Sequence, residues 1–205
     1  TAFARGGKSR SQRVSLNQLI EDTWSLIQHA IPSSLEVAMD LAEHLPDIEV
    51  DPIQMQMAIS ALFNNAIEAV DGRGRIEMST RSVAAPSAPG LSELSAQSGD
   101  YVCLTLSDTG SGMDRDTVDR LFEPFFTTKF QGRGLSMAAV YGVVKSHRGW
   151  LDIDSKPGEG TEVRLFLPAS PIVSGKIENG DPETNGTGCT ILIVDDDEML
   201  LNLNR

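Results

Sequence analysis

The stretch from Asp108 to Asp114 contains the residues best suited to bind a ligand. It reads Asp-Thr-Gly-Ser-Gly-Met-Asp and follows the apolar run 101–106, which predicts a buried strand. A carboxylate therefore stands at a strand end, and the glycines at 110 and 112 let the backbone approach another group closely. Such stretches also occur as tight turns and cation loops, so the chemistry of this one depends on its surroundings.

A second candidate lies on a helix predicted from Asp51 to about Val70, with Asp51 as N-cap and Pro52 at the first helical position. Asn65 and Glu68 are three residues apart and so share a face of this helix. Asparagine is a mediocre helix former, and a Mg²⁺ ion, which needs few protein oxygens beside phosphates and water, would explain it. The alternative is that both side chains point into water.

The third candidate is a glycine-rich loop, Gly132 to Gly134, which opens a helix predicted over residues 135–146. The free N–H groups and the positive end of the helix dipole make such a junction an anion site. Lys129 and Arg133 add positive charge nearby. A simple capped turn is the alternative.

The remaining elements predict how these segments are positioned. A helix is expected over residues 16–31 with Ser15 as N-cap, and strands are expected over residues 35–41, 48–50, 76–82, 151–154 and 163–167. Residues 156–160 read as a turn, and residues 84–99 and 169–188 as a surface loop and a polar linker. This order predicts an α+β, two-layer α/β sandwich with helices on one face of a mixed β-sheet.

Composition excludes some function classes. The net charge of -12, from 29 acidic and 17 basic residues, argues against a general nucleic-acid or anionic-membrane surface. No apolar run is long enough to span a bilayer and no signal peptide is evident, so a soluble, cytoplasmic chain without direct membrane contact is expected. Cys103 and Cys189 lack metal-ligand spacing and read as free thiols, with Cys103 in the core.

In order and spacing, these segments resemble the ATP-binding catalytic domain of sensor histidine kinases. The matching residues are Asn65, Asp108-x-Gly110-x-Gly112, Phe125-Phe126-Thr127-Thr128-Lys129, Gly132-x-Gly134 and Gly160-Thr161. The resemblance covers residues 14–168 and extends to the wider family of gyrase, Hsp90 and MutL, while the phenylalanine segment and residues 141–145 resemble histidine kinases specifically. It implies the Bergerat ATP-binding fold, with ATP and Mg²⁺ as cofactors.

The resemblance also implies roles for the matched positions. Asp108 would accept a hydrogen bond from the adenine amino group, and Thr161 would support Asp108 directly or through water. Gly110 and Gly112 would let the chain pass close to the base. Asn65 would hold a Mg²⁺ ion that bridges the phosphates.

A phosphate-covering lid is implied at Lys129 and in the backbone from Gly132 through Gly134 and Leu135 to Ser136. This lid is shorter than the usual one, and Ser136 adds a Cβ where similar kinases carry glycine. The departure favours, as an alternative, a degenerate nucleotide-binding module used for partner interaction.

Another alternative is an ATPase of the gyrase or MutL type. Such an enzyme would need a glutamate one turn before Asn65 to activate water, whereas Ala61 occupies that position here. Glu68 stands where some relatives carry a basic residue. We expect Glu68 either to contact Mg²⁺-bound water or to lie on the surface.

The two ends resemble neighbouring modules. Residues 1–13 resemble the end of a helical dimerisation domain that carries the phospho-accepting histidine, and residues 189–205 resemble the start of a receiver domain, with Asp195 and Asp196 as its Mg²⁺-binding acidic corner. The resemblance therefore implies a hybrid kinase, homodimeric at full length, whose partners are its upstream histidine domain and a receiver, its own or that of a separate response regulator. The fragment itself is expected to be a monomer without the acceptor histidine.

Overall fold

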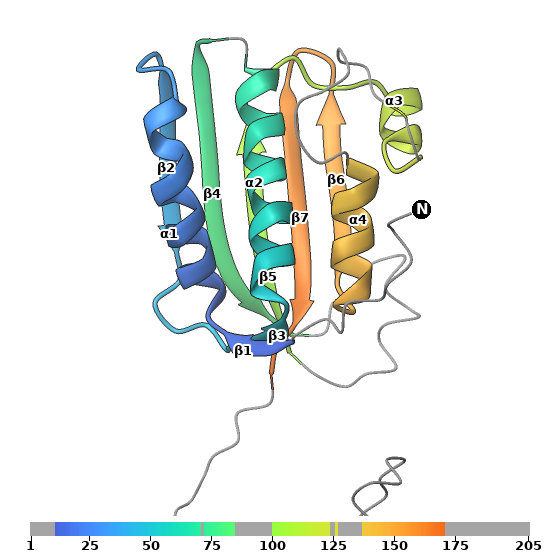
Figure 1. Ribbon diagram of the computed structural model, residues 1–205. Coiled ribbons are helices and arrows are strands. Elements are labelled where there is room, and N and C mark those ends of the chain that lie inside the picture. The colour runs from blue at the N-terminus through green and yellow to red at the C-terminus, as the bar shows by residue number, and fades with distance from the viewer. Residues whose placement is uncertain (1–10, 71, 85–99, 124–125, 127–136, 171–205) are drawn as a thin grey trace, which may run out of the picture. The chain divides into compact units, whose positions relative to one another are not determined.

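The computed structural model describes residues 11–70, 72–84, 100–123, 126 and 137–170. Five strands form one sheet in the order β2-β4-β5-β7-β6 (Figure 1). Their bounds are β2 Leu35–Leu41, β4 Gly74–Val83, β5 Tyr101–Asp108, β6 Trp150–Lys156 and β7 Gly160–Pro168. β2 and β4 are parallel and the other three pairs are antiparallel, so the predicted mixed sheet is confirmed.

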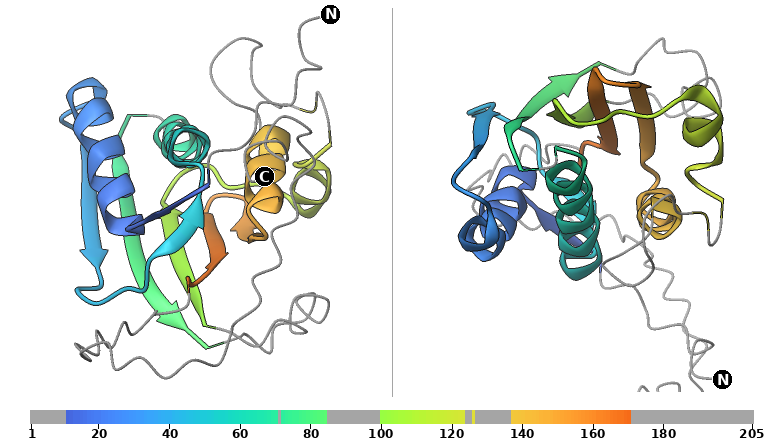
Figure 2. Two further views of the ribbon diagram at one scale, coloured as in Figure 1. Left: turned by 60° about the horizontal axis from the view of Figure 1, so that its bottom comes forward. Right: turned by 90° about the horizontal axis from the view of Figure 1, so that it is seen from above.

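Helices cover one face of this sheet, as predicted. They are α1 (Leu16–Ile27), which continues into the short 3-10 helix η1 (Gln28–Ala30), α2 (Pro52–Ala69) and α4 (Met137–Ser146). Seen from above, these three α-helices lie on the same side of the strands (Figure 2). A shorter helix, α3 (Arg115–Arg120), lies beyond the β6 edge (Figure 1).

Local signals account for the starts of the two long helices. The Ser15 hydroxyl accepts a hydrogen bond from the Gln18 N–H at 3.4 Å, at the start of α1. The Asp51 carboxylate accepts from the N–H groups of Ile53 and Gln54 at 3.1 and 3.2 Å, so both predicted N-caps are confirmed. α1 ends four residues earlier than the predicted Ile31, because the chain tightens into η1.

A small second sheet lies at the end of α1 nearest the N-terminus. β1 (Gln12–Val14) pairs antiparallel with β3 (Ile48–Val50). The sequence predicted β3 but not β1, whose residues were expected to end an upstream element. Three residues with half-exposed or exposed side chains have no readable pattern of their own, and here the pairing with β3 makes them a strand.

The core lies between α1, α2, α4 and the sheet. α2 contributes most of the buried helical side chains, namely Met55, Ala58, Ile59, Ala61, Leu62, Phe63 and Ala66. They face a layer of sheet residues that includes Ile76, Met78 and Leu104, all at most 1% exposed. Cys103 is also buried, as predicted, and burial raises the pKa of its thiol. No helix in the described ranges is both long and apolar enough to cross a bilayer.

His147 joins the end of α4 to the start of α2. Its Nε2 accepts a hydrogen bond from the Asp51 N–H at 2.9 Å, and its Nδ1 lies 2.8 Å from the Val143 carbonyl oxygen. The proton therefore sits on Nδ1, which donates to Val143, and the buried ring is neutral. The link to α2 depends on the tertiary structure, because Asp51 and His147 are 96 residues apart.

We expect His147→Leu to lower the free energy of unfolding by about 1–3 kcal/mol, because the Asp51 N–H would lose its acceptor in a partly buried place. Urea titration followed by circular dichroism measures the change. His44→Leu is the matched control, since His44 is exposed and should tolerate the same replacement. Equal stabilities for the two variants would contradict the assigned role.

Candidate functional site

Sheet register brings three of the polar side chains into one row. Asp108 is opposite Ile76 of β4 on one side and Thr161 of β7 on the other, and Thr161 is opposite Ser155 of β6. Directly opposed residues of neighbouring antiparallel strands share a face of the sheet. Ile76 is fully buried beneath the helices, so Asp108, Thr161 and Ser155 also lie on the helical side.

The neighbouring row faces the opposite way and lines a different surface. Ser107, Glu77 and Glu162 border a groove of about 340 Å³ on the uncovered face of the sheet. Its arginines are paired with carboxylates: Arg75 Nε lies 2.6 Å from Glu77, and Arg81 contacts Asp40. These exposed pairs contribute little to stability, and the groove lies across the sheet from Asp108.

The loop after Asp108 is fixed to the end of α2 and to the start of β4. The Ser111 N–H donates to the carbonyl oxygen of Ala69, the last residue of α2, at 2.9 Å. The Thr109 N–H donates to the Arg75 carbonyl at 3.1 Å, and the Thr109 hydroxyl accepts from the Arg75 N–H at 3.0 Å. Asp108 is therefore held at a junction of helix, strand and loop.

Both glycines of this loop are required by close backbone approach, as predicted. A Cβ on Gly110 would overlap the Ala69 carbonyl, and a Cβ on Gly112 would overlap the Lys156 carbonyl. Gly112 also has a φ of 60°. The Gly110 N–H donates to Asp108 Oδ1 at 2.8 Å, which orients the carboxylate.

The turn between β6 and β7 completes the enclosure of this loop. The Gly158 N–H donates to the Ser111 carbonyl at 2.7 Å. Gly160 has a φ of 90°, and a Cβ there would overlap the Asp108 carbonyl. The predicted hairpin turn is thus confirmed, and it packs directly on the loop that follows Asp108.

Ser155 belongs to the site but was not predicted. Its hydroxyl accepts from the Met113 N–H at 2.9 Å and donates to the Gly160 carbonyl at 3.1 Å. It also lies 2.9 Å from the Thr161 hydroxyl oxygen. The predicted turn at residues 156–160 could have identified it. A hairpin that pairs Lys156 with Gly160 also pairs Ser155 with Thr161, the next residues along the two strands.

On α2, Asn65 lies one turn before the loop contact at Ala69, and Glu68 immediately precedes it. Asn65 is half-buried and shares a face with Ala69, four residues on and about 6 Å along the axis. Glu68 is exposed. The described residues contain no cluster of three His, Cys, Asp or Glu side chains able to hold a metal. A Mg²⁺ ion held by one amide oxygen beside phosphates needs no such cluster, so Asn65 fits that role.

The expected lid and receiver residues fall outside the described ranges. These are Phe125, Thr127, Thr128, Lys129, Gly132, Gly134, Leu135, Ser136, Asp195 and Asp196. Phe126 is described, and the Arg120 guanidinium lies 4.4 Å from the centre of its ring. The structure therefore describes the chain on both sides of the expected lid, at Phe126 and from Met137 onward.

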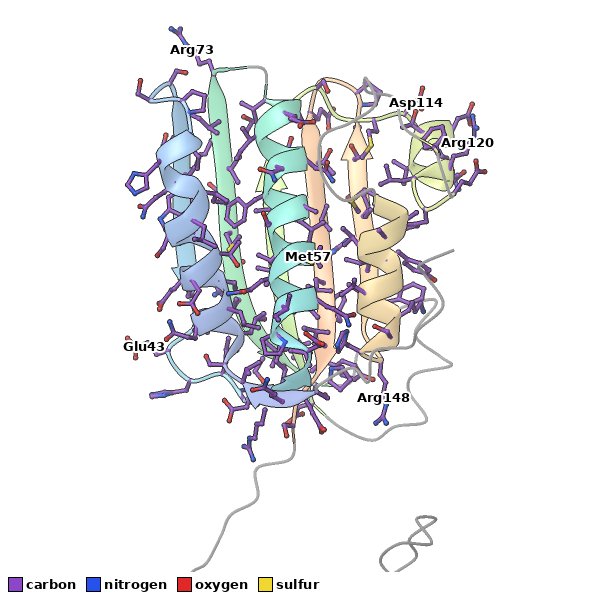
Figure 3. The ribbon with its side chains drawn as sticks, viewed as in Figure 1. Glu43, Met57, Arg73, Asp114, Arg120 and Arg148 are labelled. Atoms are coloured by element: carbon purple, nitrogen blue, oxygen red, sulfur yellow. The ribbon has the colours of Figure 1, made fainter. Side chains whose placement is uncertain are left out.

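Phe122, two residues after the end of α3, packs on Tyr141 of α4 through its ring. The rings of Phe122 and Tyr141 are 4.7 Å apart. Asp114 caps α3, and hydrogen bonds from the side chain and backbone of Thr117 lower the pKa of its carboxyl. Figure 3 labels Asp114, which precedes α3, and Arg120, the last residue of that helix.

Comparisons with known proteins agree with this geometry. A family model described as histidine kinase-, DNA gyrase B-, and HSP90-like ATPase matches residues 50–171. The sensor kinase CckA of Brucella abortus is 30% identical over 97% of this chain, which covers 22% of that protein. The sensor histidine kinase ZraS of Escherichia coli is 31% identical over 78% of this chain, which covers 31% of that protein.

A solved structure with a similar fold is the catalytic domain of histidine kinase ThkA. It has a TM-score of 0.65 and 20% sequence identity, and the match covers 78% of this chain and 96% of that one. The chain thus spans nearly all of a solved catalytic domain but only about a fifth to a third of the two curated relatives, at 22% and 31% of their lengths.

We expect Gly110→Ala to destabilise the protein by about 1–3 kcal/mol, since the new methyl group would force the loop away from Ala69. Gly142→Ala in α4 is the control: nothing lies within 4 Å of its added Cβ, and alanine favours a helix. Thermal unfolding of the two variants measures the difference. A Gly110→Ala protein as stable as Gly142→Ala would show that the loop does not depend on this contact.

Proposed function

The chain belongs to the family of histidine kinase-, DNA gyrase B- and HSP90-like ATPases, and we propose that it is the part of a sensor histidine kinase that binds ATP with Mg²⁺ and presents the γ-phosphate to a histidine outside it. Its relatives named above are sensor kinases. The phosphoryl transfer of the whole protein is part of the proposal.

The position of Asp108 is the observation that carries the proposal. It ends the central strand β5, faces the helical layer, and is held by the Gly110 N–H at 2.8 Å. A carboxylate in a half-buried place is a strong acceptor for an amino group. We propose that it accepts from the adenine amino group, that Gly110 and Gly112 border the base, and that Thr161 supports the acceptor.

For the phosphates, we propose that Asn65 holds the Mg²⁺ ion, which supplies positive charge when bound. Glu68, exposed one turn nearer the loop, either contacts Mg²⁺-bound water or only the solvent. Lys129 and the backbone of residues 132–136 cover the phosphates. The protein's share of the transfer is positioning and charge neutralisation, because the transferred phosphoryl group is loosely bonded in the transition state.

The chain spans only 22% and 31% of the lengths of its two curated relatives, so we look for its partners in the remaining parts of such proteins. We propose that the phospho-accepting histidine lies in an upstream dimerisation domain and that a receiver domain takes the phosphoryl group afterwards. Asp195 and Asp196 would start such a receiver within the same protein. The ATP-binding domain would act in the cytoplasm, alone as a monomer and in the full protein as part of a homodimer.

An ATPase of the gyrase or MutL type is disfavoured by the residue one turn before Asn65. Ala61 stands there, 5% exposed and within the apolar core. A methyl group cannot activate water. A module that keeps the fold only for partner binding would be the remaining rival, and a nucleotide titration separates it from the proposed function.

We expect an ATP analogue with Mg²⁺ to bind the protein, and Asp108→Asn to weaken this binding about 10-fold to 150-fold, as for the loss of a hydrogen bond to a charged group. Isothermal titration calorimetry measures both affinities. Asp119→Asn removes the same charge from the exposed side of α3 and should bind like the wild type. No binding by the wild type would favour the partner-binding module.

We also expect the chain of residues 1–205 to remain unlabelled when incubated with Mg²⁺ and γ-labelled ATP, because no acceptor histidine is expected within it. Autoradiography of the purified protein tests this, and a full-length kinase serves as positive control. Label on any of its three histidines would refute the expectation.

A further inference from the structure

The Ser155 hydroxyl is the meeting point of three segments of the site. It contacts the Met113 N–H, beyond the loop after Asp108, at 2.9 Å. In β7 it contacts the Gly160 carbonyl at 3.1 Å and the Thr161 hydroxyl at 2.9 Å. It lies in the same row of the sheet as Asp108. Its contacts restrict how its neighbours can use their protons.

A proton count across these contacts orients Thr161. A serine hydroxyl has one proton and two lone pairs. Here the proton points to the Gly160 carbonyl and one lone pair accepts from the Met113 N–H. The second lone pair is left for Thr161, at 2.9 Å, so the Thr161 hydroxyl donates to Ser155. Thr161 then has only lone pairs to offer in every other direction.

We propose that Ser155 is a positioning residue for base recognition, which commits Thr161 to accept hydrogen bonds and so makes Asp108 and Thr161 a paired acceptor. The two residues are directly opposed on neighbouring strands, a spacing of about 4.5–5.5 Å between Cβ atoms. An edge of a ligand with hydrogen-bond donors satisfies such a pair, directly or through water. An edge without donors offers no hydrogen bond to either acceptor.

This inference rests on the proposed function and deepens it by naming what selects the base. The amino group at position 6 of adenine supplies two donors. The matched probe is the triphosphate of purine riboside, which has hydrogen at that position and is otherwise the same. The ratio of the two dissociation constants therefore measures recognition of the amino group, separately from binding of the phosphates.

We expect the wild type to prefer ATP and Ser155→Ala to reduce this preference about threefold to tenfold, the effect of about one neutral hydrogen bond. The Thr161 hydroxyl would be released and would no longer be held as an acceptor. Ser155→Thr keeps the hydroxyl and should show the same preference for ATP as the wild type. Ser79→Ala is the control, because Ser79 is also a strand serine but lines the groove on the uncovered face.

A double-mutant cycle tests whether Ser155 acts through Thr161. In a Thr161→Val background, Ser155→Ala should change the ATP preference no further, because the group that it orients is missing. A general loss of structure would instead lower both affinities together in either background. Should Ser155→Ala fail to fold, the nearly isosteric Ser155→Cys replaces it, since a thiol is a weak acceptor and should also reduce the ratio.

The outcomes separate this inference from the proposed function. A wild type that binds neither triphosphate would overturn both. A wild type that prefers ATP, with an unchanged ratio in Ser155→Ala or in Ser155→Cys, would overturn only the role of Ser155. The role of Ser155 would be established by three results together. Ser155→Ala reduces the preference for ATP, Ser155→Thr keeps the wild-type preference, and Ser155→Ala has no further effect in the Thr161→Val background.

Discussion

The contact between the end of α2 and the loop after Asp108 is the constraint on which the site depends. The Ser111 N–H binds the last helical carbonyl, Ala69, at 2.9 Å, and the absence of a side chain on Gly110 makes that approach possible. One contact thereby relates two ligand-binding candidates, the Asp108 carboxylate and the Asn65 face of α2. In the proposed function, Asp108 binds the adenine and Asn65 binds the Mg²⁺ ion at the phosphates. One nucleotide can reach both residues only if this junction holds them at a fixed separation.

Strand register is the second constraint, because it determines which residues face the helices. Asp108 and Ser107 are neighbours in the chain, yet one lies beneath the helical layer and the other borders the groove on the uncovered face. A slip of one residue would exchange them, and would also expose apolar residues such as Leu104 and Leu106. Burial of the apolar face therefore holds the row of Asp108, Thr161 and Ser155 on the helical side of the sheet.

Much of the fold was predictable because its signals are local. Ser15 and Asp51 cap helices through N–H groups two or three residues away. In β2, the alternation of apolar and polar residues indicates which face of the strand is exposed to solvent. The short strand β1 and the link between α4 and α2 lack such signals. β1 is three residues long and depends on β3, 34 or more residues later. The Asp51–His147 hydrogen bond spans 96 residues and has no signature in either segment.

The sequence by itself determined the residue types of the site and their order: a carboxylate at a strand end, two glycines after it, and an asparagine in the middle of a helix. Their family resemblance follows from that order. Only the tertiary structure revealed which atoms satisfy one another, including the Ser155 hydroxyl between Met113, Gly160 and Thr161. The reason is physical: a hydroxyl has one proton and two lone pairs, and their use depends on neighbours that only the folded chain brings within 3.1 Å.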